Sequence, residues 1–236
     1  MEDDAAAGWI AEAFETGNPL AALPEPPADI TAGERIAAAV LDRLGLAPCG
    51  IRLGPGATGL AGRIGGPMLE GRLLAPKTPV LLAALRHARA TAALLAVLAE
   101  DLAAVGDGLP AFATLHPAID LAASRFTAAP TQDALLAADL GGLGQVVVGR
   151  GVAAPPLEPL RAVPASLALA GRRRRAVPVD LAAALAEATL AARRLGGLPA
   201  GAVLVIAGLT PAILPAPGMV LALDLGLFGR VRATLA

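Results

Sequence analysis

The spacing of hydrophobic and polar positions predicts three helices. Residues 4–17 repeat apolar side chains at helical spacing. A second helix is expected over residues 31–44, opened by Thr31 and Glu34 in the pattern of a capping box. Residues 180–195 fit a helix best, because Asp at the N-cap position is followed by an apolar repeat, two arginines in the last turn and a glycine.

Short apolar runs between glycines and prolines predict strands. The glycine-rich residues 48–71 mix a short strand with loops, residues 145–149 ("QVVVG") fit one strand, and residues 166–179 fit a hairpin with arginines at its tip. Near the C-terminus, "AVLVIAG" (202–208) and "MVLALDL" (219–225) fit two buried strands joined by a proline-rich turn.

Two segments carry weaker signals. Residues 79–101 are mostly alanine and leucine, so propensity alone predicts a helix there. Residues 127–139 read as a connector with a short helix capped by Thr131. Because helices and short strands are interleaved along the chain, the predicted fold class is α+β.

The composition describes a globular chain with few charges. Of its 236 residues, 56% are hydrophobic, 17% are charged and 2% are aromatic, so alanine, leucine and valine must build the core. The formal net charge is −1, which gives no field that would recruit nucleic acid or an anionic membrane. Stacking aromatics for RNA are also scarce. We therefore expect no nucleic-acid partner.

The uncharged run 195–223 is long enough to span a bilayer, but it holds four prolines and five glycines, which would break a spanning helix. The acidic start "MEDDAAAGW" lacks the features of a secretory signal. The lone Cys49 can form neither an internal disulfide nor a thiolate metal cluster. We expect a cytoplasmic protein that does not enter a membrane.

One segment, "TLHPAIDLAASRF" (114–126), carries candidate chemistry. It places His116 four residues before Asp120 in a chain with two histidines. The two side chains fit a catalytic pair or part of a metal site, and they also fit a turn histidine and a surface acid, which Pro117 between them favours. Elsewhere, the glycine-rich 54–62 matches no phosphate-binding motif, and the arginines of 172–175 fit a solvated turn.

Five segments in order resemble one family, the 2-keto-4-pentenoate hydratases and related 2-oxo-acid hydratases and decarboxylases of the fumarylacetoacetate hydrolase superfamily. They are "CGIRLG" (49–54), "LEGRLL" (69–74), "HPAIDLAASRF" (116–126), "ADLGGLGQVVVG" (138–149) and 198–236. The resemblance implies a mixed β-sheet roll with flanking helices. It implies a catalytic-fold domain over 49–236 that forms one compact unit with an N-terminal helical region, 1–48.

The resemblance also implies a Mg²⁺ or Mn²⁺ ion that chelates a 2-oxo acid and is held by three carboxylates. Two come from an E-x-E on one strand, where residues i and i+2 share a face. The third is the Glu of H-P-A-I-E. Asp120 stands at that third position, and the alignment places Thr91 and Ala93 at the other two. The same alignment makes residues 90–98 a strand, against their helical composition.

Other departures affect the same site. Arg52 replaces the family's lysine, Met219 replaces an acid, and the loop 138–144 has lost its serines. The nearby Glu100 and Asp101 are adjacent, so in a strand they would point to opposite faces. The resemblance therefore implies a scaffold that keeps Asp120 as a remnant metal ligand and has lost most of the polar site.

Three functions follow from these residues. The first is a non-catalytic relative that serves as a subunit or binding module, as a homo-oligomer or in complex with a related protein. The second is an active hydratase or lyase with a rearranged site, in which Arg52 clamps a substrate carboxylate and His116 acts as acid or base. The third is a binding protein for a small 2-oxo acid. We expect no cofactor, with Mg²⁺ or Mn²⁺ required if activity is retained.

Overall fold

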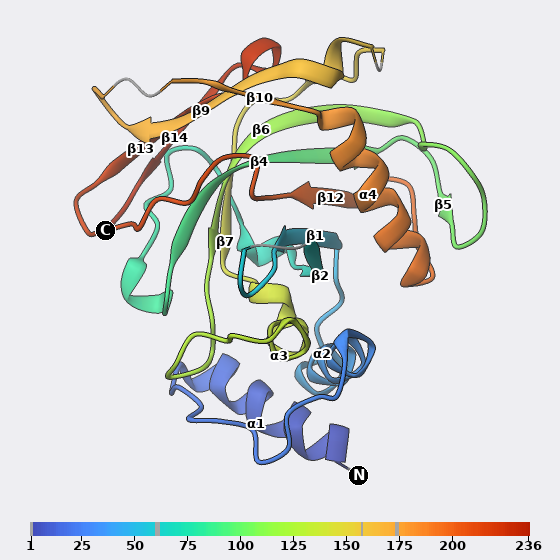
Figure 1. Ribbon diagram of the computed structural model, residues 1–236, viewed down its shortest axis with the longest axis vertical. Helices are drawn as coiled ribbons and strands as arrows, with labels where there is room; N and C mark the ends of the chain where they lie inside the picture. Colours follow the sequence, from blue (N-terminus) through green and yellow to red (C-terminus); the bar gives the residue numbers. More distant parts are fainter. Residues whose placement is uncertain (1, 60–61, 157, 173–174) are drawn as a thin grey trace.

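Three helices lie together at one end of the chain's computed structural model (Figure 1). The structure describes residues 2–59, 62–156, 158–172 and 175–236. The helices are α1 (Glu2–Thr16), α2 (Ile30–Leu44) and the short α3 (Asp133–Ala138). All three were predicted. The predicted cap of α3 was wrong, because α3 begins after Gln132, which makes no side-chain cap, and not after Thr131.

The caps of the longer helices follow the chemistry of aspartate. At α2 the Asp29 carboxylate accepts the N–H of Ala32 at 2.7 Å, so the prediction of Thr31 as the cap was wrong. Thr31 lies inside the first turn, two residues too late to receive that hydrogen bond. At α4 (Leu181–Arg194) the predicted cap Asp180 is confirmed, since its side chain accepts a backbone N–H at 2.9 Å.

A curled eight-stranded sheet forms the centre of the molecule, in the order β2-β1-β12-β4-β6-β7-β3, with β8 pairing β6. Most neighbours are antiparallel, and β1–β12 and β3–β7 are parallel. Its strands are β1 (Gly50–Pro55), β2 (Arg63–Met68), β3 (Leu73–Leu74), β4 (Arg89–Leu98), β6 (Phe112–Ala122), β7 (Gln145–Val148), β8 (Val152–Ala153) and β12 (Val203–Ile206).

A second, four-stranded sheet in the order β10-β9-β13-β14 lies above the first (Figure 1). It contains the predicted hairpin of β9 and β10, whose tip arginines at 173 and 174 lie outside the described residues. The two predicted C-terminal strands are confirmed, one in each sheet. The remaining strands are β9 (Val163–Leu169), β10 (Val177–Val179), β13 (Val220–Asp224), β14 (Arg230–Thr234), and the separate pair β5 (Leu102–Ala103) and β11 (Gly197–Leu198).

Short 3₁₀ helices connect several strands. They are η1 (Glu70–Arg72), η2 (Leu82–Ala84), η3 (Leu140–Gly142), η4 (Glu158–Ala162) and η5 (Gly226–Phe228). Of these, η3 bears on function, because it brings a tight glycine turn against β1 and β2.

Strand β4 settles the ambiguous alanine- and leucine-rich segment. The strand implied by the alignment is confirmed, and the helix implied by propensity is wrong. The strand lies between β12 and β6, and both of its faces are covered: Leu94 packs in one core cluster and Leu95 in the other. A strand buried on both faces needs a continuous apolar run, so it loses the alternation that identifies a strand in sequence.

Two core clusters divide the molecule into layers. One fills the space between the large sheet, the four-stranded sheet and α4, and the other fills the space between the opposite face and the N-terminal helices. The second cluster joins Ile10 of α1 and Val40 of α2 to Leu95 and Val205 of the sheet. Helices α1 and α2 therefore share a hydrophobic core with strands of the large sheet.

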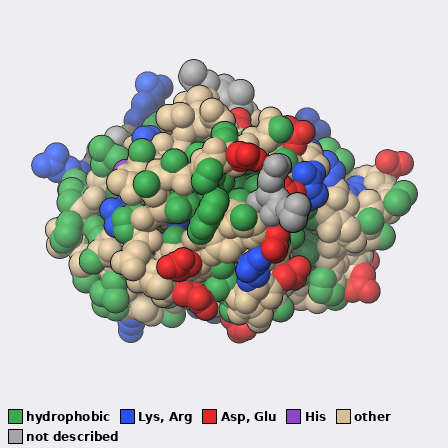
Figure 2. Space-filling view, turned by 90° about the horizontal axis from the view of Figure 1, so that it is seen from below, with side chains coloured by type: hydrophobic (Ala, Val, Ile, Leu, Met, Phe, Trp, Pro, Cys, Tyr) green, Lys and Arg blue, Asp and Glu red, His purple; other side chains and the backbone are tan. Residues whose placement is uncertain are grey.

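Within the described part of the chain, no helix combines the length and apolar character that crossing a bilayer would require. Seen from the end of the three helices, hydrophobic side chains stand between acidic and basic ones (Figure 2).

The surroundings of two helical glycines, Gly33 on α2 and Gly8 on α1, predict opposite effects on stability when each is replaced by alanine. A Cβ on Gly33 would lie 2.3 Å from the Ala134 carbonyl oxygen and 2.9 Å from the Ala137 Cβ, whereas a Cβ on Gly8 would meet nothing closer than 3.6 Å. Gly33→Ala should lower the free energy of unfolding by about 1–3 kcal/mol. Gly8→Ala should raise it by up to ~1 kcal/mol through helix propensity. Urea denaturation of both variants tests this, and equal effects would contradict the packing.

Candidate functional site

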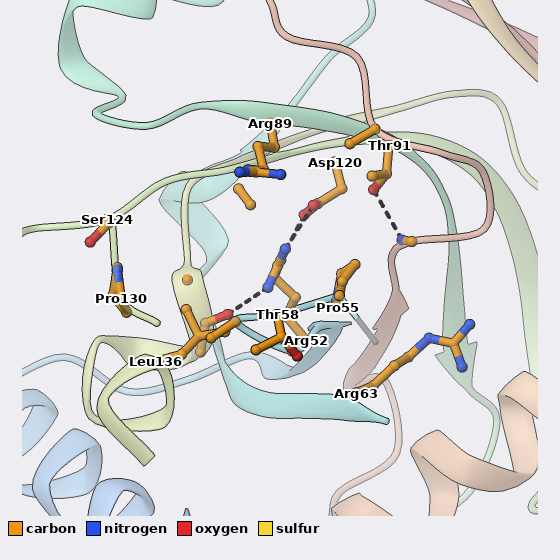
Figure 3. A pocket seen from close by; sticks show the side chains of 18 of the residues that line it. Arg52, Pro55, Thr58, Arg63, Arg89, Thr91, Asp120, Ser124, Pro130 and Leu136 are labelled. Carbon is orange, nitrogen blue, oxygen red and sulfur yellow. Dashed lines mark hydrogen bonds and ion pairs between the residues drawn. The ribbon is translucent and has the colours of Figure 1, made fainter. Parts of the chain in front are cut away.

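A cavity of ≈ 740 Å³ opens between the curled sheet and the loops that follow its strands. Its floor contains Arg52 of β1, Thr91 of β4 and Asp120 of β6, and its walls include the turn of η3 and the chain after β12 (Figure 3). Five segments of the chain thus meet at one place.

A buried ion pair forms the floor of this cavity. Arg52 Nε donates to one carboxylate oxygen of Asp120 at 2.6 Å, and Arg52 Nη2 donates to the other at 2.7 Å. Arg52 Nη1 donates to the Gly141 carbonyl at 2.6 Å. Both side chains are only 1% exposed. Both oxygens of Asp120 are therefore engaged by one guanidinium in bidentate geometry.

The pair exists because the large sheet curls. Strands β1 and β6 are separated in the sheet by β12 and β4. In a flat sheet, strands three positions apart would lie ~14 Å apart, too far for one arginine and one aspartate to meet side by side. The curl turns β1 toward β6, and the ion pair joins them across the concave face.

Glycines make room for the guanidinium. A Cβ on Gly54, two residues after Arg52 on the same face of β1, would lie 2.4 Å from Arg52 Nη1. A Cβ on Gly66 would lie 2.4 Å from the Leu140 carbonyl oxygen, so this glycine lets the η3 turn approach β2. The turn itself runs through positive φ at Leu140 (54°) and Gly141 (62°), which places the Gly141 carbonyl against Arg52.

Two threonine hydroxyls tie the chain after β12 to β4. Thr91 Oγ1 accepts the N–H of Gly208 at 3.0 Å, and Thr210 Oγ1 accepts the N–H of Ala92 at 3.1 Å. Both threonines are buried and line the cavity. Because each hydroxyl oxygen already accepts a backbone hydrogen, each still has its own hydrogen to donate to a bound molecule.

Three arginines and two carboxylates line the cavity, which leaves an excess of one positive charge when His87 is neutral. Arg52 pairs with Asp120, and Arg63 pairs with Glu187. Arg89 lies two residues before Thr91, its side chain turns into the cavity (Figure 3), and within the described ranges it has no ion-pair partner. The charge available to a ligand is thus positive.

The residues singled out from the sequence separate into two groups. Arg52, Thr91 and Asp120 meet in the cavity, and Thr91 and Asp120 are directly paired across β4 and β6. Ala93 lies deeper in the core, 0% exposed and opposite Ala118.

His116 lies away from the cavity that holds Asp120. Four residues along a strand separate the two by ~13 Å. Its Nδ1 donates to the Gly149 carbonyl at 3.0 Å, and its Nε2 lies 3.0 Å from the Thr114 hydroxyl. The geometry does not bring His116 and Asp120 together as a pair.

The other candidates from the sequence form hydrogen bonds to the backbone and lie outside the cavity. Glu100 and Asp101 follow the far end of β4 and accept backbone N–H groups of loops, at 3.0 Å and 2.7 Å. The Cys49 thiol donates to the Met68 carbonyl, and burial raises the pKa of this thiol, so the thiolate is disfavoured.

The residues present do not fit a divalent metal ion. Mg²⁺ and Mn²⁺ bind through several oxygen ligands, of which a protein usually supplies one or two carboxylates that are free to reach the ion. Among the described residues, no group of three or more His, Cys, Asp or Glu lies close enough together to hold an ion. The one carboxylate on the cavity floor, Asp120, has both oxygens bound to Arg52.

Sequence reasoning missed Arg89, Thr210 and the Gly141 carbonyl. Arg89 had a usable signal, since it shares a strand face with Thr91 at a spacing of two residues. Thr210 and Gly141 had none, because loops place them and no local pattern predicts where a loop will return to a sheet.

Solved structures share this fold. The 4-oxalocrotonate decarboxylase from Pseudomonas putida G7, complexed with calcium and acetate, is 19% identical, with a TM-score of 0.79 over 100% of this chain and 97% of that chain. The 2-hydroxyhepta-2,4-diene-1,7-dioate isomerase from Mycobacterium marinum is 11% identical, with a TM-score of 0.56 over 81% and 75%. Maleylpyruvate hydrolase from Sphingobium sp. SYK-6 is 14% identical, with a TM-score of 0.54 over 79% and 70%.

No protein-family model matches the sequence, and no curated protein matches it. At such low identity the structural likenesses establish the fold. The predicted mixed-sheet roll with flanking helices is therefore confirmed. The likeness to the decarboxylase extends over the whole chain, including the N-terminal helices.

The glycine beside Arg52 predicts a strong effect from one methyl group. In Gly54→Ala the guanidinium must move, and moving it leaves Asp120 buried without its partner. The free energy of unfolding should fall by about 3–5 kcal/mol. The control is Gly65→Ala on the neighbouring strand, where a Cβ would meet nothing closer than 3.7 Å, so the change should stay within about 1 kcal/mol. If both variants unfold alike in guanidinium chloride, Arg52 is not held as described.

Proposed function

We propose that this chain binds a small organic acid, of the 2-oxo-acid type, in the cavity above Arg52 and Asp120, and that it does so as a non-catalytic module without bound metal. The observation that carries the proposal is the bidentate ion pair on the cavity floor, in which Arg52 occupies both oxygens of Asp120. Because the cation beside Asp120 is Arg52, the ion pair supports a site in which the protein itself, and no metal ion, supplies the positive charge.

Metal-dependent chemistry would need Asp120 to leave Arg52. Separating a buried ion pair without replacing either partner costs about 3–5 kcal/mol. An incoming ion would gain one carboxylate in return, because the positions aligned with the other two ligands are Thr91 and Ala93. The exchange is unfavourable in this chain.

The lining of the cavity favours an anion rich in hydrogen-bond acceptors. Both carboxylates in the lining are already paired with arginines, while Arg89 and the hydroxyls of Thr91 and Thr210 can donate. A carboxylate with an adjacent keto group has acceptors only, and it matches such donors. Structures of the decarboxylase that shares this fold were solved with calcium and acetate and with magnesium and adipate, and acetate and adipate are small carboxylates.

An active hydratase or lyase is the second candidate, and it has less support. It would use Arg52 as a substrate clamp and His116 as acid or base, but His116 lies outside the cavity and bonds the Gly149 carbonyl. Assembly into a homo-oligomer, or with a related protein, also belongs to the proposal. Native mass spectrometry of the purified protein tests it.

The proposal predicts that a chelator does not change the affinity for the ligand. Calorimetry with Mg²⁺ or Mn²⁺ should give no saturable heat at millimolar ion, because no set of free carboxylates remains. Binding of 2-oxopentanoate should be the same with and without EDTA. Hydration of 2-hydroxypenta-2,4-dienoate, followed by loss of its ultraviolet absorbance, should not exceed the rate without protein. Tight metal binding with turnover would overturn the proposal in favour of the active enzyme.

The unpaired arginine of the cavity should carry part of the affinity. Arg89→Gln removes a charge-assisted hydrogen bond to the bound acid and should weaken 2-oxopentanoate binding by roughly tenfold or more. Arg86→Gln is the matched control, because Arg86 is exposed on the same segment and does not line the cavity. Titration calorimetry measures both. Equal affinities in the two variants would remove Arg89 from the site.

A further inference from the structure

Three oxygen atoms converge on the Arg52 side chain. Two belong to Asp120 and one to the Gly141 carbonyl, at 2.6–2.7 Å from three different nitrogens. The space that the guanidinium fills exists because Gly54 has no Cβ, and the carbonyl reaches it through the positive-φ turn at Gly141. All of these contacts involve the guanidinium group of Arg52, and none involves the aliphatic part of the side chain.

We propose that the floor of the cavity is a binding seat for a guanidinium ion, in which Arg52 is a tethered occupant that a free guanidinium can replace. The seat fits the planar guanidinium at two edges. The Asp120 carboxylate accepts hydrogen bonds from Nε and Nη2 along one edge, and the Gly141 carbonyl accepts one from Nη1 at another. An ammonium has no planar fork, and a divalent ion would find one carboxylate. The seat therefore selects shape as well as charge.

The same cation is the anchor for the acid ligand, and this step rests on the proposed function. A guanidinium has five N–H donors, and the described residues accept three of them from Arg52. Two donors remain on a side chain that lines the cavity. The positive charge belongs to a side chain of the protein, so no bound ion has to supply it. The seat thus gives the site a cation that chelators do not remove.

The test removes the Arg52 side chain by mutation and then supplies a free guanidinium in its place. Arg52→Ala leaves Asp120 buried and unpaired, so Tm should fall by roughly 6–20 °C. Methylguanidinium, which supplies the missing planar group, should raise Tm of this variant saturably, by at least ~3 °C at about 20 mM. Methylammonium and Mg²⁺ should raise it by less. A Tm that no cation raises, or that methylammonium or Mg²⁺ raises as much, overturns the proposal.

Two controls isolate the seat. Arg63→Ala removes another cavity arginine whose side chain is 24% exposed, and methylguanidinium should not raise Tm of that variant. In Arg52→Ala/Asp120→Asn the carboxylate charge is gone, so the rescue should disappear. A rise of equal size in either control would mean that methylguanidinium acts nonspecifically.

A second pair of variants covers failure of Arg52→Ala to fold. Arg52→Met/Asp120→Leu removes both charges and should fold with a higher Tm than Arg52→Met alone, because no unpaired carboxylate remains. An equal or lower Tm in the double variant overturns the proposal.

Acid binding separates this proposal from the proposed function. In Arg52→Ala, affinity for 2-oxopentanoate should fall at least tenfold and return with methylguanidinium. If methylguanidinium restores Tm while the unmodified protein binds no acid, the seat stands and the proposed function fails. If the unmodified protein binds the acid and no cation rescues Arg52→Ala, the proposed function stands and the seat fails.

Discussion

The ion pair between Arg52 and Asp120 is the interaction on which the cavity depends. It joins β1 to β6 across the concave face of the curled sheet, and it is almost fully buried. Removing two charges from water is costly, and the cost is offset only where the geometry is close and the remaining donors are satisfied. Here the bidentate contact and the bond to Gly141 meet that condition. The arrangement of the floor therefore follows from one electrostatic constraint.

That constraint extends to the loop that supplies the carbonyl. Just before the η3 turn, buried Asp139 accepts the Ser124 hydroxyl at 2.6 Å and pairs with Arg125. Arg125 also donates to the Asp139 carbonyl at 2.6 Å. A second buried ion pair thus fixes the turn from the side of β6, while Gly66 allows it to lie against β2. The turn is thus fixed by the Arg125–Asp139 pair on one side and by the bond from Arg52 to the Gly141 carbonyl on the other. Such surrounding contacts keep a turn with positive φ in one conformation.

The sequence predicted the elements better than their meeting points. The helices, the hairpin and most strands follow from local patterns, and β4 required the alignment because its two buried faces erase the alternation. The sequence also identified Arg52, Thr91 and Asp120 as residues of one site. It did not predict that Arg52 would bind Asp120, since that contact depends on the curl of the sheet. His116 and Asp120 are likewise separated because β6 is extended, so a spacing of four residues holds the two side chains ~13 Å apart.

Charge balance supports the proposed site without a metal ion. The three carboxylates, the divalent ion and the lysine implied by the sequence resemblance carry charges that sum to zero. This chain keeps one carboxylate and one arginine on the floor, which also sum to zero. A buried site tolerates little net charge, so a floor with one carboxylate and one arginine is consistent with the proposed absence of a divalent ion. Arginine then serves better than lysine, because its planar fork binds both oxygens of the remaining carboxylate and still has donors for a ligand.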